Sequence, residues 1–230
     1  MRLGLVLAAL CLTSPAISDS SVAEKAEDEF GKPLLIAGLQ SAFGRLNPPV
    51  VVLYADGRLL YRDHQPGFSY VRLTKAELAG LLHSLPLAKL ETVRGDWAPN
   101  TDDGWSSFLV YYPPDGEAIV AAGHGGLHDP QDRARAPRAV AAVFKRLWSF
   151  RSPRAVHWIP RLVKLEFSTV HTYDVGTFPP DWPANWPRSS SAWPLLVPRE
   201  QLPEIERYAS TLDKEHWRLF ITYPYPHEGE

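Results

Sequence analysis

The chain has 230 residues, of which 45% are hydrophobic, 22% charged and 11% aromatic, and it carries 24 Lys and Arg against 26 Asp and Glu. This composition is typical of a globular protein and excludes a disordered or collagen-like chain. The net charge of −2 gives no sign of the basic surface by which nucleic-acid-binding proteins contact phosphates, so we expect no nucleic-acid partner.

The first 18 residues have the pattern of a secretory signal peptide. Arg2 precedes an apolar run over residues 3–12, and small residues at 16 and 18 favour cleavage before Asp19. The run is shorter than the roughly 20 residues of a membrane-spanning helix, and no later stretch reaches that length, so we expect no membrane span. The single cysteine, Cys11, leaves with this segment. The sequence therefore predicts an exported protein, periplasmic or secreted, whose mature chain is free of cysteine.

An N-terminal arm is predicted over residues 19–44, because its first part is rich in charged residues and has little to bury. A single α+β domain is expected to follow over residues 45–230. It opens with a hairpin in which residues 50–54 and 58–62 are the strands. Asp56-Gly57 between them favours a type I′ turn, which needs positive φ at both central positions.

Three later segments have the pattern of helices. Thr74 and Glu77 form a capping box, and leucines follow at helical spacing up to Leu85. A second helix is predicted to begin at Pro137, and a third covers residues 202–212. The apolar stripe of the second helix consists of Val140, Val143, Phe144, Leu147 and Trp148.

The segments between and after these helices read as strands, because they are rich in aromatic residues or alternate apolar with polar ones. They are residues 105–112, 117–122, 162–168 and 217–223. The predicted fold class is α+β, with a mainly antiparallel sheet and about three helices packed on one face.

The two halves of the domain, residues 45–157 and 158–230, share an order of elements. Strand 50–54, the first helix and strand 105–112 have counterparts in strand 162–168, the third helix and strand 217–223. The sequence leaves open whether this order reflects an internal duplication or chance.

The hairpin carries a resemblance. Tyr54-Ala55-Asp56-Gly57-Arg58, followed by Leu73-Thr74 at the start of a leucine-rich helix, is similar to the beginning of a group of bacterial secreted proteins of uncharacterised activity. A Trp-Pro in the last third and a Tyr-Pro near the end are similar as well. The resemblance implies an exported α+β domain and assigns no functional residues.

A glycine-rich loop holds two histidines and a carboxylate, His124, His128 and Asp129, which are ligand types that zinc prefers. The glycines disfavour a helix that would place both histidines on one face, and no Glu stands where a metal-dependent hydrolase keeps its base. We therefore interpret the segment as a solvated loop and expect no metal and no cofactor. A metal-assisted hydrolase that uses His124 and His128 is the alternative.

Three tryptophans, Trp182, Trp186 and Trp193, lie in the proline-rich segment 178–198. Six prolines there remove backbone donors and fix φ, which predicts a strip close to polyproline II. Exposed indoles on such a strip would stack on a sugar or anchor a protein partner. The alternative is burial against a sheet, and we expect at least two of the three indoles to be more than two-thirds buried.

No nucleophile elbow, Ser-x-x-Lys pattern or phosphate-binding loop follows any predicted strand. The sequence therefore assigns no catalytic residue, and it favours a non-enzymatic binding or interaction module over an enzyme. Its partner is expected to be a protein or a carbohydrate, with Trp182, Trp186 and Trp193 as the candidate binding residues.

Overall fold

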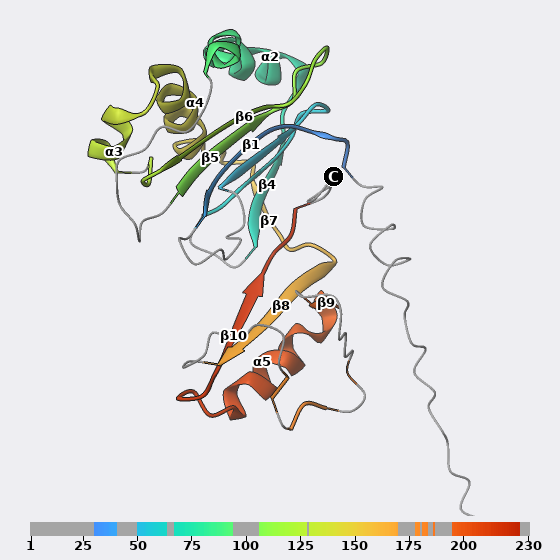
Figure 1. Ribbon diagram of the computed structural model, residues 1–230. Coiled ribbons are helices and arrows are strands. Elements are labelled where there is room, and N and C mark those ends of the chain that lie inside the picture. The colour runs from blue at the N-terminus through green and yellow to red at the C-terminus, as the bar shows by residue number, and fades with distance from the viewer. Residues whose placement is uncertain are drawn as a thin grey trace, which may run out of the picture.

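The computed structural model describes residues 30–40, 50–63, 67–93, 106–127, 129–169, 178–179, 181–183, 186 and 195–225. These residues form two antiparallel β-sheets with helices packed against them (Figure 1), so the predicted α+β class is confirmed. The predicted signal peptide, residues 1–18, lies outside the described residues. No helix within the described ranges is long and apolar enough to cross a bilayer.

The larger sheet has seven strands in the order β6-β5-β1-β2-β3-β4-β7, and each pairs antiparallel with its neighbours. The strands are β1 (Pro33–Gln40), β2 (Val51–Tyr54), β3 (Arg58–Tyr61), β4 (Phe68–Arg72), β5 (Ser106–Tyr111), β6 (Ile119–His124) and β7 (Val156–Trp158). β1 lies in the middle, between β2 and β5. The prediction of an arm over residues 19–44 therefore does not hold for residues 33–40, and the sheet begins before the expected boundary at residue 45.

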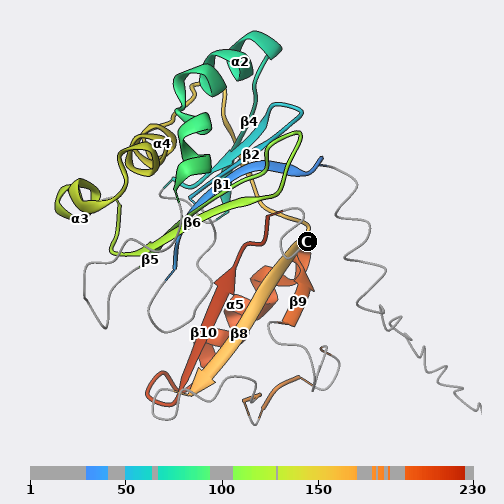
Figure 2. The same cartoon turned by 45° about the horizontal axis from the view of Figure 1, so that its top comes forward.

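Helices cover one face of this sheet (Figure 2). They are α2 (Lys75–Ser84), the 3-10 helix η1 (Leu87–Thr92), α3 (Pro130–Arg135) and α4 (Arg138–Trp148). The predicted capping box begins α2: the Glu77 amide donates to Thr74 Oγ1 at 3.2 Å, and the Thr74 amide donates to Glu77 Oε2 at 2.7 Å. Two backbone donors at the start of α2 are thereby satisfied.

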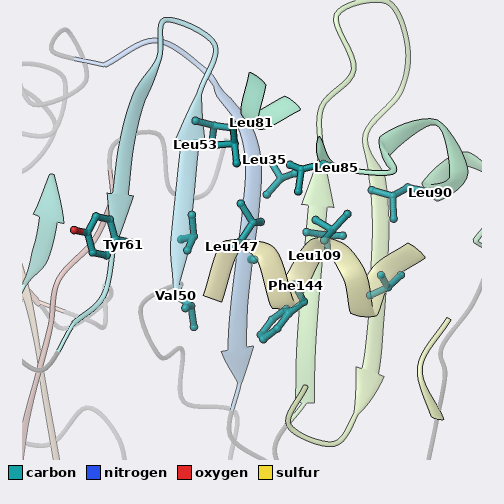
Figure 3. Packing of buried hydrophobic residues seen from close by; sticks show 14 of the residues in the cluster. Leu35, Val50, Leu53, Tyr61, Leu81, Leu85, Leu90, Leu109, Phe144 and Leu147 are labelled. Atoms are coloured by element: carbon teal, nitrogen blue, oxygen red, sulfur yellow. The ribbon is translucent and has the colours of Figure 1, made fainter. Parts of the chain in front are cut away.

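The main hydrophobic core lies between these helices and the sheet (Figure 3). α4 buries Val140, Val143, Phe144 and Leu147, four residues of the predicted stripe, and the fifth, Trp148, is half-buried. They pack with leucines of three neighbouring strands, Leu35, Leu53 and Leu109. The helical spacing in the sequence thus identified the buried side of α4.

The predicted hairpin joins β2 and β3, but its turn differs from the prediction. Leu53 pairs with Leu59, the Gly57 amide donates to the Tyr54 carbonyl at 3.1 Å, and Gly57 has φ of 86°. The loop therefore has three residues, 55–57, and closes on a left-handed glycine instead of forming a two-residue type I′ turn. A Cβ at Gly57 would lie 2.8 Å from the Leu73 carbonyl oxygen, so the chain requires glycine there.

The smaller sheet has the order β10-β8-β9, again antiparallel. Its elements are β8 (Leu162–Thr169), β9 (Leu195–Pro198), the 3-10 helix η2 (Arg199–Gln201), α5 (Leu202–Thr211) and β10 (Trp217–Thr222). α5 packs on this sheet through Ile205, while α2, η1 and α4 pack on the larger one. The helices are thus divided between two sheets, where the sequence predicted one.

The chain that leaves β10 returns to the larger sheet. Tyr223 packs against both the core of the smaller sheet and the apolar cluster on the sheet face opposite the helices, and Tyr225 packs against the latter. Figure 1 shows this red segment rising from β10 towards the seven-stranded sheet. The face of the larger sheet that carries no helix is therefore partly covered by residues from the end of the chain.

Candidate binding surfaces

The first candidate is the tryptophan segment. The Trp182 amide donates to the Pro179 carbonyl at 3.0 Å, and the Trp186 amide donates to the Pro183 carbonyl at 3.1 Å. Polyproline II has no internal hydrogen bonds, so the predicted extended strip is wrong here and two turns take its place. These turns bring the two indoles together, with ring centroids 5.0 Å apart and ring planes at 80°.

Both described indoles belong to the core of the smaller sheet. Trp182 and Trp186 are 3% and 8% exposed, which confirms the expectation that at least two of the three would be buried. Trp182 contacts Phe167 of β8 edge-to-face at 5.0 Å, and both indoles contact Tyr208 of α5, at 5.6 and 5.4 Å. Trp193 lies outside the described residues. Since these contacts cover the ring faces, we base no binding proposal on Trp182 or Trp186.

Tyr208 places a polar group inside this aromatic cluster. Its hydroxyl is buried and has no hydrogen-bond partner among the described residues. Burial raises the pKa of the Tyr208 hydroxyl above its usual range, and the negative charge of Asp181 adds to the effect. The hydroxyl therefore stays protonated at neutral pH. The ring of Tyr208, through its contacts with the two indoles, packs α5 onto the core of the smaller sheet.

The second candidate is the histidine loop. His124 is the last residue of β6, where it pairs with Ser106, and His128 lies outside the described residues. The carboxylate of Asp129 caps α3 by accepting the Gln131 amide at 2.6 Å. No group of three or more His, Cys, Asp or Glu side chains that could hold a metal occurs within the described residues.

The backbone between the two histidines is fixed by side chains from outside the loop. Buried Ser107 donates its hydroxyl to the Gly125 carbonyl at 2.8 Å and accepts the Leu127 amide at 2.8 Å. Asp132 accepts the Gly126 amide at 3.0 Å. Hydrogen bonds within the protein therefore hold the backbone of this loop and engage the nearby carboxylate of Asp132.

The third candidate is an apolar band on the face of the larger sheet opposite the helices, which we call the apolar row. The strand registers align one residue from each of the seven strands. The row consists of Val120, Val110, Ile36, Val52, Leu60, Tyr70 and Val156, in the order β6 to β7. Its middle is buried, but Val120 and Val156 at its two ends are 60% and 58% exposed.

The middle of the row is covered by aromatic residues. The ring of Phe30, just before β1, lies 6.0 Å from that of Tyr70 and 5.4 Å from that of Trp158. Tyr223 and Tyr225 pack against the same cluster. Exposed apolar surface therefore remains at the β6 and β7 edges.

β6 is the edge with the fewest obstacles to a further strand. Among the described strands it pairs with β5 alone, and Ile119 to Gly123 contain neither a charged residue nor proline. The other edges have features that discourage pairing: β7 has three residues, β9 has four and ends in Pro198, and β10 carries the exposed Arg218. The sequence predicted a strand over residues 117–122, and the lack of charge after Glu117 was the only signal of an edge with this property.

Comparison with known proteins adds no assignment, because no protein-family model, curated protein or solved structure matches this chain. Function is therefore argued from the surfaces of the molecule.

Proposed function

We propose that this chain is an exported, non-enzymatic interaction module that takes up an extended segment of a protein partner at β6. The proposal that it is exported rests on residues 1–18, which lie outside the described residues. The observation that carries the binding proposal is the β6 edge: six residues long, uncharged over Ile119 to Gly123, and exposed at Val120.

An edge strand offers a partner two kinds of contact. Its outward backbone N–H and C=O groups can form hydrogen bonds with a partner strand of any sequence. Alternate side chains of the added strand then contact alternate side chains of the edge strand. At β6 those side chains are Val120 and the half-buried Ala122, which lie on the same face as Val110. A partner strand with apolar residues at alternate positions would therefore extend the apolar row by one strand.

The two ends of the apolar row provide a matched pair of variants. Val120→Lys and Val156→Lys make the same change at side chains of similar exposure, 60% and 58%, on opposite edges of one sheet. Both positions are on the surface, so each change is expected to alter stability by no more than about 0.5 kcal/mol. A lysine at β6 discourages strand addition there, whereas one at β7 leaves β6 unchanged.

The probe is a peptide selected from a random display library against the mature chain, with its affinity measured by titration calorimetry. We expect the selected peptides to carry apolar residues at alternate positions. The wild type and Val156→Lys should bind them with equal affinity, and Val120→Lys should bind them at least tenfold more weakly. Equal affinity for both variants, or peptides without such alternation, would contradict binding at β6. Dimerisation through β6 in place of peptide binding would show as a concentration-dependent mass that Val120→Lys abolishes, and would reject a separate protein partner.

A further inference from the structure

Positive charge is concentrated in one part of the chain. Residues 133–165 contain nine Lys and Arg and no Asp or Glu, although acidic residues outnumber basic ones in the whole sequence. This segment runs from the second half of α3 through α4 and β7 into β8. An unbalanced charge run of this length is visible only when charge is read locally, because the net charge of −2 conceals it.

α4 arranges its share of this charge along its exposed side. Arg138, Lys145 and Arg146 are exposed, and we call them the cationic stripe. Lys145 and Arg146 follow Arg138 by seven and eight residues, which is about two helical turns. The three side chains therefore share one face of the helix, opposite the buried Val143 and Phe144. Arg135, at the end of α3, is exposed as well.

Other cations of the segment are engaged with the protein. Arg154 forms an ion pair with Glu77 at 2.5 Å, and Arg151 donates to the Trp148 carbonyl at 3.0 Å. Arg133 donates to the Leu127 carbonyl at 3.2 Å. The cationic stripe, in contrast, has no ion pair with any residue that the structure describes.

Stability of the helix does not explain the whole stripe. Lys145 and Arg146 lie in the last turn of α4, where positive charge interacts favourably with the helix dipole. Arg138 lies in the first turn, where a positive charge is unfavourable. No acidic residue occurs in that first turn to compensate. The charge at both ends of α4 therefore points to a ligand outside the chain.

We propose that the cationic stripe docks on the anionic headgroups of a lipid bilayer. α3 and α4 lie on the side of the larger sheet away from β8, β9 and β10 (Figures 1 and 2), so a flat surface can approach α4 without meeting the smaller sheet. With 11 residues, α4 is about 16 Å long, and its cations reach several headgroups at once. Its apolar side is already buried in the core, so the contact is electrostatic and peripheral, without insertion.

This proposal is independent of strand addition at β6, because the stripe and β6 use different elements and different chemistry. Each cation near an anionic bilayer contributes about fivefold to the partition coefficient. Three together are expected to contribute on the order of a hundredfold, and salt should weaken the binding because it screens exposed charges.

The test uses the mature chain and sedimentation with vesicles, either of phosphatidylcholine alone or with added phosphatidylglycerol. The variant Arg138→Gln/Lys145→Gln/Arg146→Gln neutralises the stripe. The control Arg207→Gln/Lys214→Gln/Arg218→Gln removes the same charge from exposed positions around α5 and β10. A third variant, Arg138→Lys/Arg146→Lys, keeps the charge of the stripe.

We expect wild type, control and charge-keeping variant to bind phosphatidylglycerol vesicles in low salt, and the stripe variant to bind on the order of a hundredfold more weakly. None of them should bind vesicles of phosphatidylcholine alone. The proposal is overturned if the wild type does not bind vesicles that contain phosphatidylglycerol, or if the control loses as much binding as the stripe variant. Stripe-dependent binding to polyglutamate that exceeds binding to vesicles would assign the surface to an acidic protein instead and reject the lipid.

Discussion

The two sheets are built by the same path of the chain and are covered in different ways. In the larger sheet a meander, β1 to β4, is followed by α2, and the chain returns as β5 beside β1. In the smaller sheet the antiparallel pair β8 and β9 is followed by α5, and the chain returns as β10 beside β8. Both helices have ten residues. The larger sheet buries its face under leucine-rich helices, whereas the smaller one uses a single helix and two indoles.

This path changes the correspondence that the sequence predicts between the halves. The helices α2 and α5 and the strands β5 and β10 hold equivalent places, as predicted. β8, however, takes the place of β1 and not that of β2, residues 51–54. β3, β4, β6 and β7 of the larger sheet have no counterpart in the smaller one, so the internal duplication that the sequence left open stays a prediction.

The opposite faces of the two sheets differ in charge. The face of the smaller sheet away from α5 carries Lys164, Glu166 and Arg218 beside the half-buried Leu196 and Phe220, whereas the apolar row of the larger sheet contains no charged residue. A charged face needs no cover, while an apolar face must be buried or bound. We therefore place the proposed interaction surface on the larger sheet, whose apolar face is partly covered by Tyr223.

The largest expected effect concerns the indoles that replace helices in the smaller sheet. Trp182→Ala removes a side chain that is 3% exposed and contacts Phe167, Trp186 and Tyr208, so it should lower the free energy of unfolding by about 3–5 kcal/mol. Trp182→Phe, which keeps a ring, should cost less. Urea unfolding followed by circular dichroism measures both, and a loss below about 1 kcal/mol for Trp182→Ala would mean that the indoles are not a core.

The next effect concerns the leucines of α2 in the larger sheet. Leu81 is 5% exposed, whereas Leu82 is half-buried. Leu81→Ala should therefore cost about 2–5 kcal/mol, and Leu82→Ala clearly less. The same denaturant titrations give both values, and equal costs would show that α2 packs with a different side towards the sheet.

A smaller effect separates the starts of the two equivalent helices. α2 begins with the Thr74 capping box, whereas Gln201 before α5 makes no side-chain cap. Thr74→Ala should cost about 1 kcal/mol, and Gln201→Ala should be close to neutral. If the two substitutions lower the melting temperature equally, the side-chain cap at Thr74 does not stabilise the start of α2.

The capping box also predicts a dependence on pH. Its hydrogen bond from the Thr74 amide, and then that from Arg154, hold the pKa of Glu77 below its usual range. A carboxylate with a lowered folded-state pKa stabilises the protein above its unfolded-state pKa and loses this contribution as pH falls through the folded-state value. The wild type should thus exceed Glu77→Gln in stability at neutral pH and approach it in acid, and a constant difference between their melting temperatures across this range would contradict a stabilising contribution from the Glu77 charge.

The smallest expected effect is that of metal. If the histidine loop is held by Ser107 and Asp132 alone, zinc or a chelator should leave the melting temperature of the mature chain unchanged. A stoichiometric rise with zinc that the double variant His124→Ala/His128→Ala abolishes would favour the hydrolase alternative.

The sequence predicted local features well, because local interactions determine them. The capping box at Thr74 and the stripe that includes Val143 were both confirmed. The central strand over residues 33–40 was missed, because side chains on both of its faces are buried, Leu35 towards the helices and Ile36 away from them. Such a strand reads as a continuous apolar run without the alternation that marks a half-buried one.

Candidate sites were harder to predict, because they depend on contacts between distant residues. The sequence predicted a strand over residues 117–122, which the structure has at 119–124, but the edge position of this strand follows from pairing across the whole sheet. The indoles at 182 and 186 were expected on a polyproline strip, since the prolines fix φ without specifying a turn. In the structure two turns bury these indoles, and both indoles contact Tyr208 of α5, a residue far along the chain.

Amide hydrogen exchange at β6, followed by NMR, gives a direct test of strand addition at this edge. We expect every second amide from Ile119 to His124, those facing away from β5, to exchange rapidly in the free mature chain and to become protected when the selected peptide binds. β1 amides in the middle of the sheet should stay protected throughout. Slow exchange of all β6 amides in the free chain would mean that this edge is already occupied, and it would contradict strand addition as the function.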